Sequence, residues 1–380
     1  MDIISGIAAP FETVFSYALP FLFVLTVIVF FHELGHFMVA RLCGVAVETF
    51  SVGFGKEICG FTDKKGTRWK LSWIPLGGYV KFLGDENAAS VPSRERLSEM
   101  DSAARENSFY HKSVGRRSAV VAAGPIANFI LAIVIFALMF MIVGRQITAA
   151  KVDKVQPNSA AATAGFEVGD TIVSIDGTVI EDFSGLQRVF STSAGEQLSV
   201  VVRRSDELVT LLATPELREI TDRFGNKHKM GVMGITRDTQ GDVTTERYDP
   251  LTAAWMGTKE TWFIVERTMS YLYDVIIGRQ GADQLGGPLR IAQVSGQVLQ
   301  ISFAALFNLA AVLSISIGLI NLFPIPMLDG GHLLYYGIEA LRGKPLSEKM
   351  QDIGFRVGLG LVVALMVFAT WNDLTHFNIF

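Results

Sequence analysis

Hydrophobic residues are concentrated in four long runs of this 380-residue chain, with more polar regions between them. The runs lie at residues 17–40, 118–143, 298–328 and 357–371. The last three contain no Asp, Glu, Lys or Arg, and about 20 apolar residues suffice for a helix to cross the hydrocarbon core of a bilayer. The fourth run is short for a span, so we place its start near residue 353. The pattern predicts an α-helical polytopic membrane protein with transmembrane segments in residues 1–40, 118–143, 298–341 and 353–372.

The regions between these runs have other patterns. Residues 41–117 contain a strand-like stretch at 68–82 and predict a β-rich loop associated with the membrane. Residues 149–237 hold short β-rich runs, a small-residue helix and Gly-Asp and Asp-Gly turns, which predict an inserted α+β domain. Residues 248–297 are rich in aromatic side chains, as in an amphipathic helix that lies along a membrane face.

The distribution of Lys and Arg predicts the orientation of the chain. Residues 1–40 and 372–380 contain neither, whereas 41–117 and 342–356 are basic. The positive-inside rule then places the basic loops in the cytoplasm, and both termini and the inserted domain in the periplasm, for a protein of a bacterial inner membrane. The net charge of −4 and the lack of a basic stripe exclude nucleic acid as a partner and leave the lipid bilayer.

Two further features bear on the first run. Asp2 and Glu12 stand where a cleavable signal peptide needs a basic region, so we expect the first run to be retained. Cys43 and Cys59 follow that run on the predicted cytoplasmic side, where reducing conditions favour free thiols over a disulfide.

The first run carries the motif His-Glu-Leu-Gly-His at residues 32–36. On a helix, His32 and His36 lie one turn apart on the same face, so both imidazoles can bind one zinc ion while Glu33 acts on the water beside it. A charged Glu at the bilayer centre costs about 2.5 to 3.5 kcal/mol on insertion scales, so it needs a partner or a function. The alternative is that these polar residues only hold helices together. The motif favours a hydrolytic site toward the cytoplasmic end of the span.

A zinc protease needs a third protein ligand and an open position for water. The third run ends, at residues 321–332, in Asn-Leu-Phe-Pro-Ile-Pro-Met-Leu-Asp-Gly-Gly-His. Its prolines and glycines open the helix, which a membrane tolerates only where the backbone lines a cavity. Asp329 is the only acid in this stretch and is the favoured third ligand, with His332 as a competing one. Three other histidines have no partner at ligand spacing and are predicted to be surface residues: His111, His228 and His376.

The inserted region resembles a PDZ domain of the bacterial, circularly permuted kind. The resemblance covers roughly ninety residues and depends on the string at residues 161–177, in which Ala-Gly precedes a Gly-Asp turn and a strand closed by Asp-Gly. PDZ domains capture a peptide C-terminus along a strand edge, and the candidate edge here includes Gly234 and Ile235. The alternative is that the domain is a spacer with no peptide ligand.

With these motifs placed, the chain resembles the site-2 protease family of intramembrane zinc metalloproteases, of the bacterial regulator of sigma-E protease type. The resemblance covers nearly the whole chain and includes further motifs at residues 54–55, 73–81, 112–117, 124–128 and 287–288. Two features of the sequence depart from the family pattern. Only one PDZ domain fits between the spans, where the best-known enterobacterial type has two, and Ser316 stands where Asn is expected.

The resemblance implies one zinc ion per chain, held by His32, His36 and Asp329, with Glu33 as the general base. It also implies that Asn321 and Pro324 help to hold the substrate strand near the metal. The implied substrate is a transmembrane protein, either an anti-sigma factor already trimmed outside the membrane or a signal-peptide remnant.

A transmembrane substrate must unwind before its backbone can be cut. Gly53, Phe54 and Gly55, with the stretch 68–82, are predicted to offer a strand edge to the unwound peptide. The alternative for this region is an amphipathic cytoplasmic loop.

Two functions of other classes also remain open from the sequence. A zinc transporter would place His and Asp within spans without needing the adjacent Glu, and an inactive scaffold would share the fold.

Overall fold

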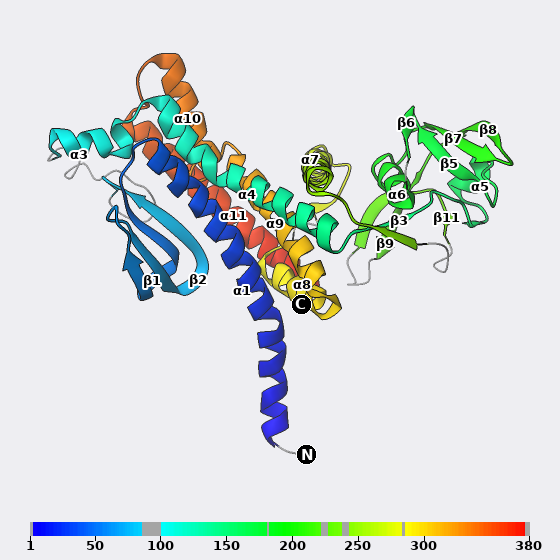
Figure 1. The fold of residues 1–380 in the computed structure, drawn as a ribbon, viewed down its shortest axis with the longest axis horizontal. Helices are drawn as coiled ribbons and strands as arrows, with labels where there is room; N and C mark the ends of the chain where they lie inside the picture. Colours follow the sequence, from blue (N-terminus) through cyan, green and yellow to red (C-terminus); the bar gives the residue numbers. More distant parts are fainter. Residues whose placement is uncertain are drawn as a thin grey trace. The chain divides into compact units, whose positions relative to one another are not determined.

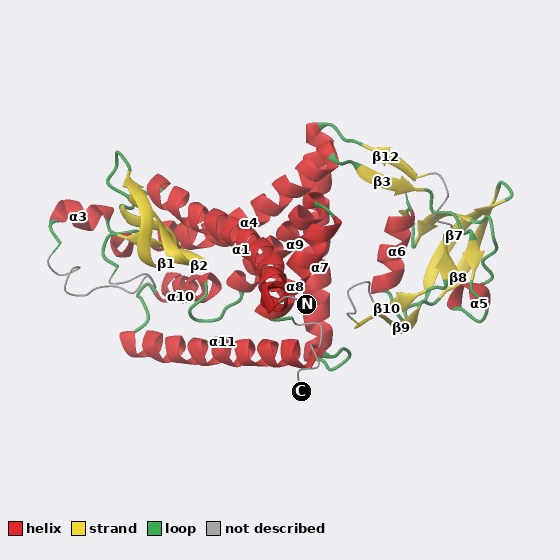
Figure 2. Ribbon diagram, turned by 90° about the horizontal axis from the view of Figure 1, so that it is seen from below, coloured by secondary structure: helices red, strands yellow, loops and turns green. Residues whose placement is uncertain are grey.

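A computed structural model describes residues 3–85, 100–180, 182–221, 227–237, 243–282 and 286–376 (Figures 1 and 2). The chain forms two compact units. A helical unit comprises Met1–Ala137, Ala254–Thr268 and Leu285–Phe380, and a β-rich unit comprises Leu138–Ala253 and Met269–Gln284. The β-rich unit is therefore an insertion in a chain whose helices come from both sides of it.

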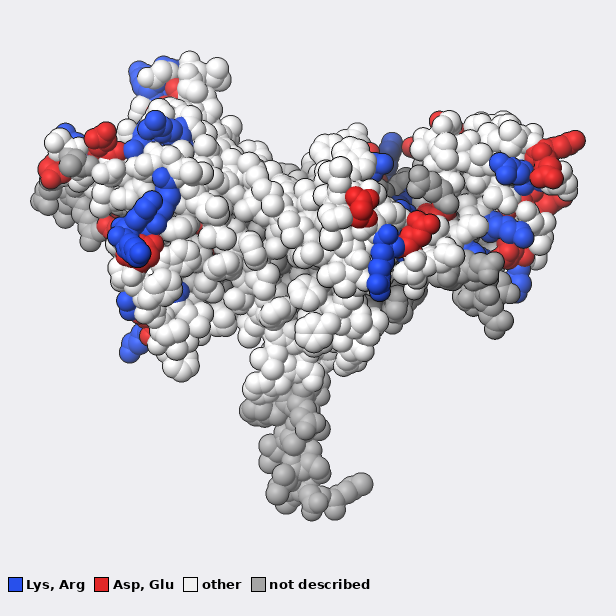
Figure 3. Space-filling model, in the orientation of Figure 1, with Lys and Arg blue, Asp and Glu red and all other residues white. Residues whose placement is uncertain are grey.

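Within the described residues, four helices are long and apolar enough to cross a membrane: Phe15–Leu42 within α1 (Ile3–Leu42), α4 (Val114–Ile142), α9 (Phe303–Leu322), and Lys349–Thr375 within α11 (Glu348–His376). They confirm the predicted four-span membrane protein with a β-rich insertion. On the face shown in Figure 3, charged residues are nearly absent from the central surface of the long helices. They gather near α3 (Ser102–Asn107) and the strands beside it, near α10 (Asp329–Arg342), and on the β-rich unit. That distribution is the one a bilayer imposes on helices that face lipid.

The third predicted segment, 298–341, is not one continuous helix. It contains the end of α8 (Pro288–Ile301), all of α9, and most of α10 (Asp329–Arg342). Pro324 and Pro326 lie in the non-helical link between α9 and α10, because proline has no backbone N–H to donate and disfavours a helical residue before it. Ser302 separates α8 from α9, and its hydroxyl accepts a hydrogen bond from the Ala305 amide at the start of α9.

The predicted amphipathic segment, 248–297, holds two helices rather than one: α7 (Pro250–Ile276) and the first part of α8. α8 packs closely against α1, where Gly296 leaves room for the ring of Tyr17. The buried carboxylate of Asp373, near the end of α11, accepts hydrogen bonds from three amides at the start of α8, those of Gly287, Leu289 and Arg290. α8 is thus fixed within the helical unit.

Between the first two spans lie two long strands, β1 (Val47–Thr62) and β2 (Arg68–Phe82). The bounds of β2 match the predicted strand. Both strands bend back on themselves, so each contributes two segments to the sheet. The first half of β1 (47–52) pairs with the second half of β2 (78–82) on one side and with the first half of β2 (68–71) on the other. The second half of β1 (57–62) also pairs with the first half of β2. The folded-back strands pack on α1, α4 and α10 through an apolar cluster that includes Phe37, Phe50, Phe82, Val120 and Tyr336.

In the β-rich unit, strands β3 (Arg145–Thr148) and β12 (Val243–Glu246) form a two-stranded ribbon where the chain enters and leaves. The main sheet has the order β6 (Thr178–Val179), β5 (Thr171–Ile175), β7 (Leu198–Arg204), β8 (Glu207–Ala213). The remaining elements are β4 (Lys154–Val155), α5 (Ala160–Ala164), α6 (Phe183–Thr192), β9 (Glu216–Thr221), β10 (Lys227–Val232) and β11 (Ile235–Thr236). A strand, a short helix, a Gly-Asp turn and a second strand thus follow in the order expected from the sequence.

Candidate metal centre

Three side chains from distant parts of the sequence converge in the helical unit. His32 and His36 project from successive turns of α1, with their Nε2 atoms 3.2 Å apart. Asp329, the first residue of α10, places its Oδ2 atom 3.2 Å from the Nε2 of His32 and 3.5 Å from that of His36. Among the described residues, these three form the one group of His, Cys, Asp or Glu whose ligand atoms could share a metal ion.

The geometry and chemistry of these donors fit zinc. Tetrahedral ligands about 2.0 to 2.1 Å from zinc lie about 3.3 Å from one another, close to the distances found here. Two imidazoles and a carboxylate are also a common protein ligand set for a catalytic zinc, which keeps the fourth position open. The Oδ2 atom of Asp329 is buried and has no hydrogen-bond partner among the described residues, as expected of an oxygen that serves a cation.

The outer nitrogen of each imidazole has a partner on α4. The Nδ1 atom of His36 lies 2.9 Å from the backbone oxygen of Val120 and donates to it, which leaves Nε2 free to bind a metal. The Nδ1 atom of His32 lies 3.2 Å from the side-chain amide of the fully buried Asn128. The amide atom placed there is Nδ2, whereas the Oδ1 of Asn128 has no partner among the described residues. A ligating His32 carries its proton on Nδ1, so turning the amide by 180°, which exchanges its oxygen and nitrogen, would give that proton an acceptor.

Two glycines allow α1 and α4 to approach each other at the site. A Cβ atom on Gly35 would lie 2.3 Å from the Ala123 carbonyl oxygen, and one on Gly124 would lie 2.2 Å from the Nε2 of His36. α9 also packs on this part of α4, where the Ser314 hydroxyl donates to the backbone oxygen of Asn128 at 2.8 Å. Gly124 and Asn128 both belong to the motif at residues 124–128, to which the sequence assigned no role at the metal.

Asp329 is positioned by a tight turn between α9 and α10. The Leu328 amide donates to the Ile325 carbonyl at 3.0 Å, with Pro326 and Met327 at the two central positions. Met327 has a φ of 88°, a left-handed conformation that favours glycine at this position of a turn and costs a non-glycine residue of order 1 to 3 kcal/mol. Such strain persists where the surrounding packing holds the backbone, as beside a functional site.

Glu33 lies between the two histidines on α1, close to the end of β2. A Cβ atom on Gly78 would lie 3.1 Å from the Cγ of Glu33, so the strand can pass this close only because residue 78 is glycine. Residues 78–82 pair with β1 along one edge, and no strand among the described residues pairs with their other edge. The backbone of Val80, within this segment, hydrogen-bonds to the Glu33 carboxylate, so the free edge of the strand runs directly past the glutamate.

The other predicted site residues lie in several places. Asn321 is in the last turn of α9 and Pro324 in the link after it, both ahead of Asp329. Phe54 is 39% exposed, stacks on Tyr79 and pairs with Ile74, and it lies between Gly53 and Gly55, which both have a φ of 87° where β1 bends. His332 is half-buried one turn along α10 and is not part of the described ligand group. His111 is exposed, whereas the side chains of His228 and His376 lie outside the described residues.

The predicted peptide edge of the insertion is partly used by the insertion itself. The Gly234 carbonyl accepts a hydrogen bond from the Gln156 amide at 2.8 Å, and Ile235 pairs with Val155 of β4. Any captured peptide would therefore have to use the remaining edge.

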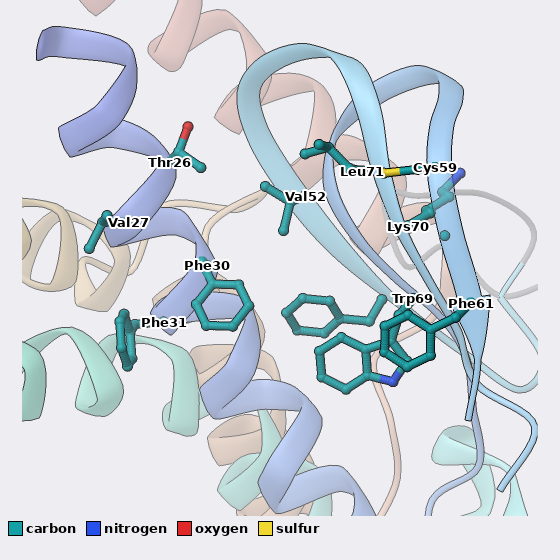
Figure 4. A pocket seen from close by; sticks show the side chains of 12 residues that line it. Thr26, Val27, Phe30, Phe31, Val52, Cys59, Phe61, Trp69, Lys70 and Leu71 are labelled. Carbon is teal, nitrogen blue, oxygen red and sulfur yellow. The ribbon is translucent and has the colours of Figure 1, made fainter. Parts of the chain in front are cut away.

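An apolar cavity of about 360 Å³ lies between α1 and the folded-back strands (Figure 4). Phe30 and Phe31 of α1 form one wall, and Figure 4 shows Phe61 and Trp69 on the strand side of the opening. The wall on α1 belongs to a predicted membrane span, so this face of the strands is suited to the membrane rather than to water.

Comparison with known proteins assigns this architecture. The sequence model of peptidase family M50 matches residues 20–365. A protein of Agrobacterium fabrum named "putative zinc metalloprotease" is 50% identical over 361 residues, which cover 95% of this chain and 96% of that protein. Metalloprotease MmpA of Caulobacter vibrioides is 39% identical, with 94% of this chain and 95% of that protein covered. Regulator of sigma-E protease RseP of Escherichia coli is 30% identical, with 94% and 98% covered.

Proposed function

This chain belongs to peptidase family M50, and on that premise we propose that it is an intramembrane protease that cleaves the transmembrane segment of single-span proteins. The observation that carries the proposal is the position of the three donors. His32 and His36 lie within a membrane span, and Asp329 reaches them from a helix that follows another span. A zinc metalloprotease with its ligands at this depth acts on peptide bonds at the membrane.

In the proposed mechanism, His32, His36 and Asp329 would hold zinc, which when bound activates water and polarises the scissile carbonyl. Glu33 takes a proton from the attacking water and delivers it to the leaving amine. The Val120 carbonyl keeps His36 oriented by accepting its outer N–H, and Asn128 would do the same for His32 once its amide is turned so that the oxygen faces Nδ1. The side-chain amide of Asn321 is our candidate for a donor to the developing oxyanion.

The substrate has to present an extended backbone to this site. Residues 78–82 have an edge beside Glu33 that pairs with no described strand, and Gly53, Phe54 and Gly55 form the adjoining bend of β1. We infer that an unwound substrate segment adds to this sheet as a strand, which satisfies its backbone hydrogen bonds away from water. Pro324 lies in the link before Asp329, where it would help hold the same strand.

We place the basic loop after the first span in the cytoplasm and the β-rich insertion in the periplasm, as the positive-inside rule requires. Reactivity of Cys43 and Cys59 toward a membrane-impermeant maleimide in sealed spheroplasts measures this orientation, and labelling of intact spheroplasts would contradict it.

We further propose that the insertion is a PDZ-type filter at residues 149–237. The relative named regulator of sigma-E protease suggests an anti-sigma factor as substrate, and a signal-peptide remnant is the second candidate.

The test compares membrane proteomes of wild type and Glu33→Gln. Gln keeps the size and polarity of the side chain but cannot act as a base, so the variant should insert, bind zinc and accumulate uncut single-span stubs. Stubs that retain an N-terminal cytoplasmic part would point to anti-sigma factors, and short hydrophobic peptides to signal-peptide remnants. Cleavage above a few per cent of the wild-type rate would remove Glu33 from the role of base.

A further inference from the structure

We propose that Arg117 is a positioning residue for the metal centre, which acts through Glu339 and Tyr336 to set the rotation and height of α10 and thereby the place of Asp329. The proposal rests on the assignment of Asp329 as a metal ligand made above. It concerns residues two helical turns away from the metal.

The contacts of Arg117 join α4 to α10. Its Nη2 atom donates to the Oε1 of Glu339 at 2.6 Å, and both side chains are only 13% exposed. The guanidinium carbon also lies 4.8 Å from the centre of the Tyr336 ring, which is itself buried. A third contact, from Nε to the Lys112 carbonyl at 3.1 Å, fixes the arginine at the start of α4.

Neither charge stabilises its own helix. Arg117 is in the first turn of α4, where the positive end of the helix dipole repels a cation. Glu339 is in the last turn of α10, where the negative end repels an anion. The two charges therefore compensate each other between helices, and the favourable contact exists only when α4 and α10 are in register.

The alignment of α4 and α10 that brings Arg117 to Glu339 also brings both helices to the metal centre. Gly124 lies seven residues after Arg117, and Asp329 lies seven residues before Tyr336, which is two turns or about 10 Å on each helix. Gly124 and Asp329 both meet His36, so the two helices run past each other in opposite directions between these points. Tyr336 packs in the same apolar cluster as Val120, whose carbonyl orients His36.

Asp329 needs such a support because its metal-facing oxygen has no hydrogen bond to hold it. The carboxylate lies about 6 Å from the axis of α10, so a rotation of 20° would move it by about 2 Å. Metal–ligand distances tolerate only about 0.2 Å. The turn before Asp329 contains the strained Met327, a conformation that persists only where the surrounding packing holds the backbone, so α10 itself has to be held in place.

The test uses the full-length protein in detergent and measures the rate of zinc loss to a chelator, with the visible spectrum of the cobalt-substituted protein as a second readout. Arg117→Ala and Glu339→Gln should each lose zinc about tenfold faster or more, as is typical when partners outside the ligand set are removed. Both should change the cobalt spectrum. The exchanged pair, Arg117→Glu with Glu339→Arg, should recover slow zinc loss, because each charge then also suits its own helix end.

Arg41 offers a matched control in the same unit. It makes an ion pair with Asp63 at 2.5 Å, with side-chain exposures of 20% and 21%, and its guanidinium carbon lies 4.6 Å from the centre of the Phe37 ring. These contacts hold the strands rather than α10, so Arg41→Ala should keep the wild-type rate of zinc loss. Equal zinc loss in Arg41→Ala and Arg117→Ala would show general loosening and overturn the proposal.

Two further outcomes separate this proposal from the ligand assignment. Wild-type zinc retention in both Arg117→Ala and Glu339→Gln would overturn the positioning role while Asp329→Ala still loses zinc. Normal zinc in Asp329→Ala itself would overturn the assignment on which the role depends. Glu339→Gln preserves the shape of the side chain, so it decides the question if Arg117→Ala fails to accumulate.

Discussion

At the scale of single residues, the site depends on which side chain of α10 faces the two histidines. Asp329 and His332 are three residues apart, and either could complete a zinc site in a membrane. The structure directs Asp329 to within 3.5 Å of both Nε2 atoms and leaves His332 outside the described ligand group. The first residue of α10, rather than the fourth, is therefore our third ligand.

Replacement of Asp329 by Ala should abolish both zinc binding and cleavage, because two imidazoles alone hold the metal weakly. His332→Ala is the matched control on the same helix and should retain zinc. Metal content of the two purified variants, measured by mass spectrometry, gives the answer. The reverse pattern would make His332 the ligand.

A second residue, Asp85, predicts a dependence of stability on pH. Its carboxylate is fully buried at the end of β2, where it accepts hydrogen bonds from the Phe82 amide and the Tyr110 hydroxyl, both at 2.8 Å. Burial raises the pKa of Asp85 to about 6, although these hydrogen bonds favour the charged form. An unfolded Asp has a pKa of about 3.9, so the folded state holds the proton more tightly.

The contribution of Asp85 is then present below pH about 4 and is lost as the pH rises through 6, by about 3 kcal/mol in total. Asp85→Asn can accept from the Phe82 amide through Oδ1 and donate to the Tyr110 hydroxyl oxygen through Nδ2, and it has no charge to gain. Hydrogen exchange of the Phe82 amide should therefore speed up between about pH 4 and 6 in the wild type, after correction for intrinsic exchange, but not in the variant. Identical profiles would show that the carboxyl titrates normally.

At the scale of elements, the contact between α1 and α4 determines the space around the histidines. Gly124 is the point on α4 that faces both imidazoles, and α4 holds His36 through the Val120 carbonyl. His36 cannot move aside without losing that hydrogen bond. The glycine is thus required by the neighbouring helix rather than by its own backbone conformation.

Gly124→Ala should weaken zinc binding by about tenfold or more, since an overpacked site costs about 1 to 3 kcal/mol. Gly115→Ala on the same helix is the control, because a Cβ atom there meets nothing within 4 Å and alanine favours a helix. Zinc affinity from competition with a chelator distinguishes the two. Equal affinities would mean that the site can relax around the added methyl group.

At the scale of the whole molecule, the β-rich insertion is an addition to the catalytic part of the chain. The three ligands and Glu33 all belong to the helical unit. Thr148 of β3 pairs with Val243 of β12, so the chain leaves and returns at neighbouring positions. A short turn can therefore join these two residues if the sequence between them is removed.

Replacement of residues 149–242 by Asn-Gly should leave hydrolysis intact and allow cleavage of substrates that keep a bulky periplasmic domain, if the insertion is a filter. Cleavage of trimmed and untrimmed substrates in membranes measures the selectivity. Ile235→Ala should relax selectivity only if peptide capture at that edge contributes. A deletion variant that inserts and binds zinc but cuts neither substrate would show that the insertion serves docking instead.

The sequence by itself determined what depends on near neighbours. Period and composition located the four spans, the strand at 68–82 and the one-turn spacing of His32 and His36, because each is a property of a continuous stretch. Family membership likewise followed from motifs, and the family model confirms it. The break between α8 and α9 at Ser302 had no proline or glycine to mark it, so the third segment was expected as one piece.

Only the tertiary structure decided what depends on the packing of distant elements. The sequence favoured Asp329 over His332, but only the rotation of α10, which no local pattern records, brings Asp329 within 3.5 Å of both Nε2 atoms. The partners of the histidines on α4 and the contact between Arg117 and Glu339 join residues between 84 and 222 positions apart. Such contacts form when helices settle in one register, because side chains on rigid cylinders can meet only where rotation and height agree.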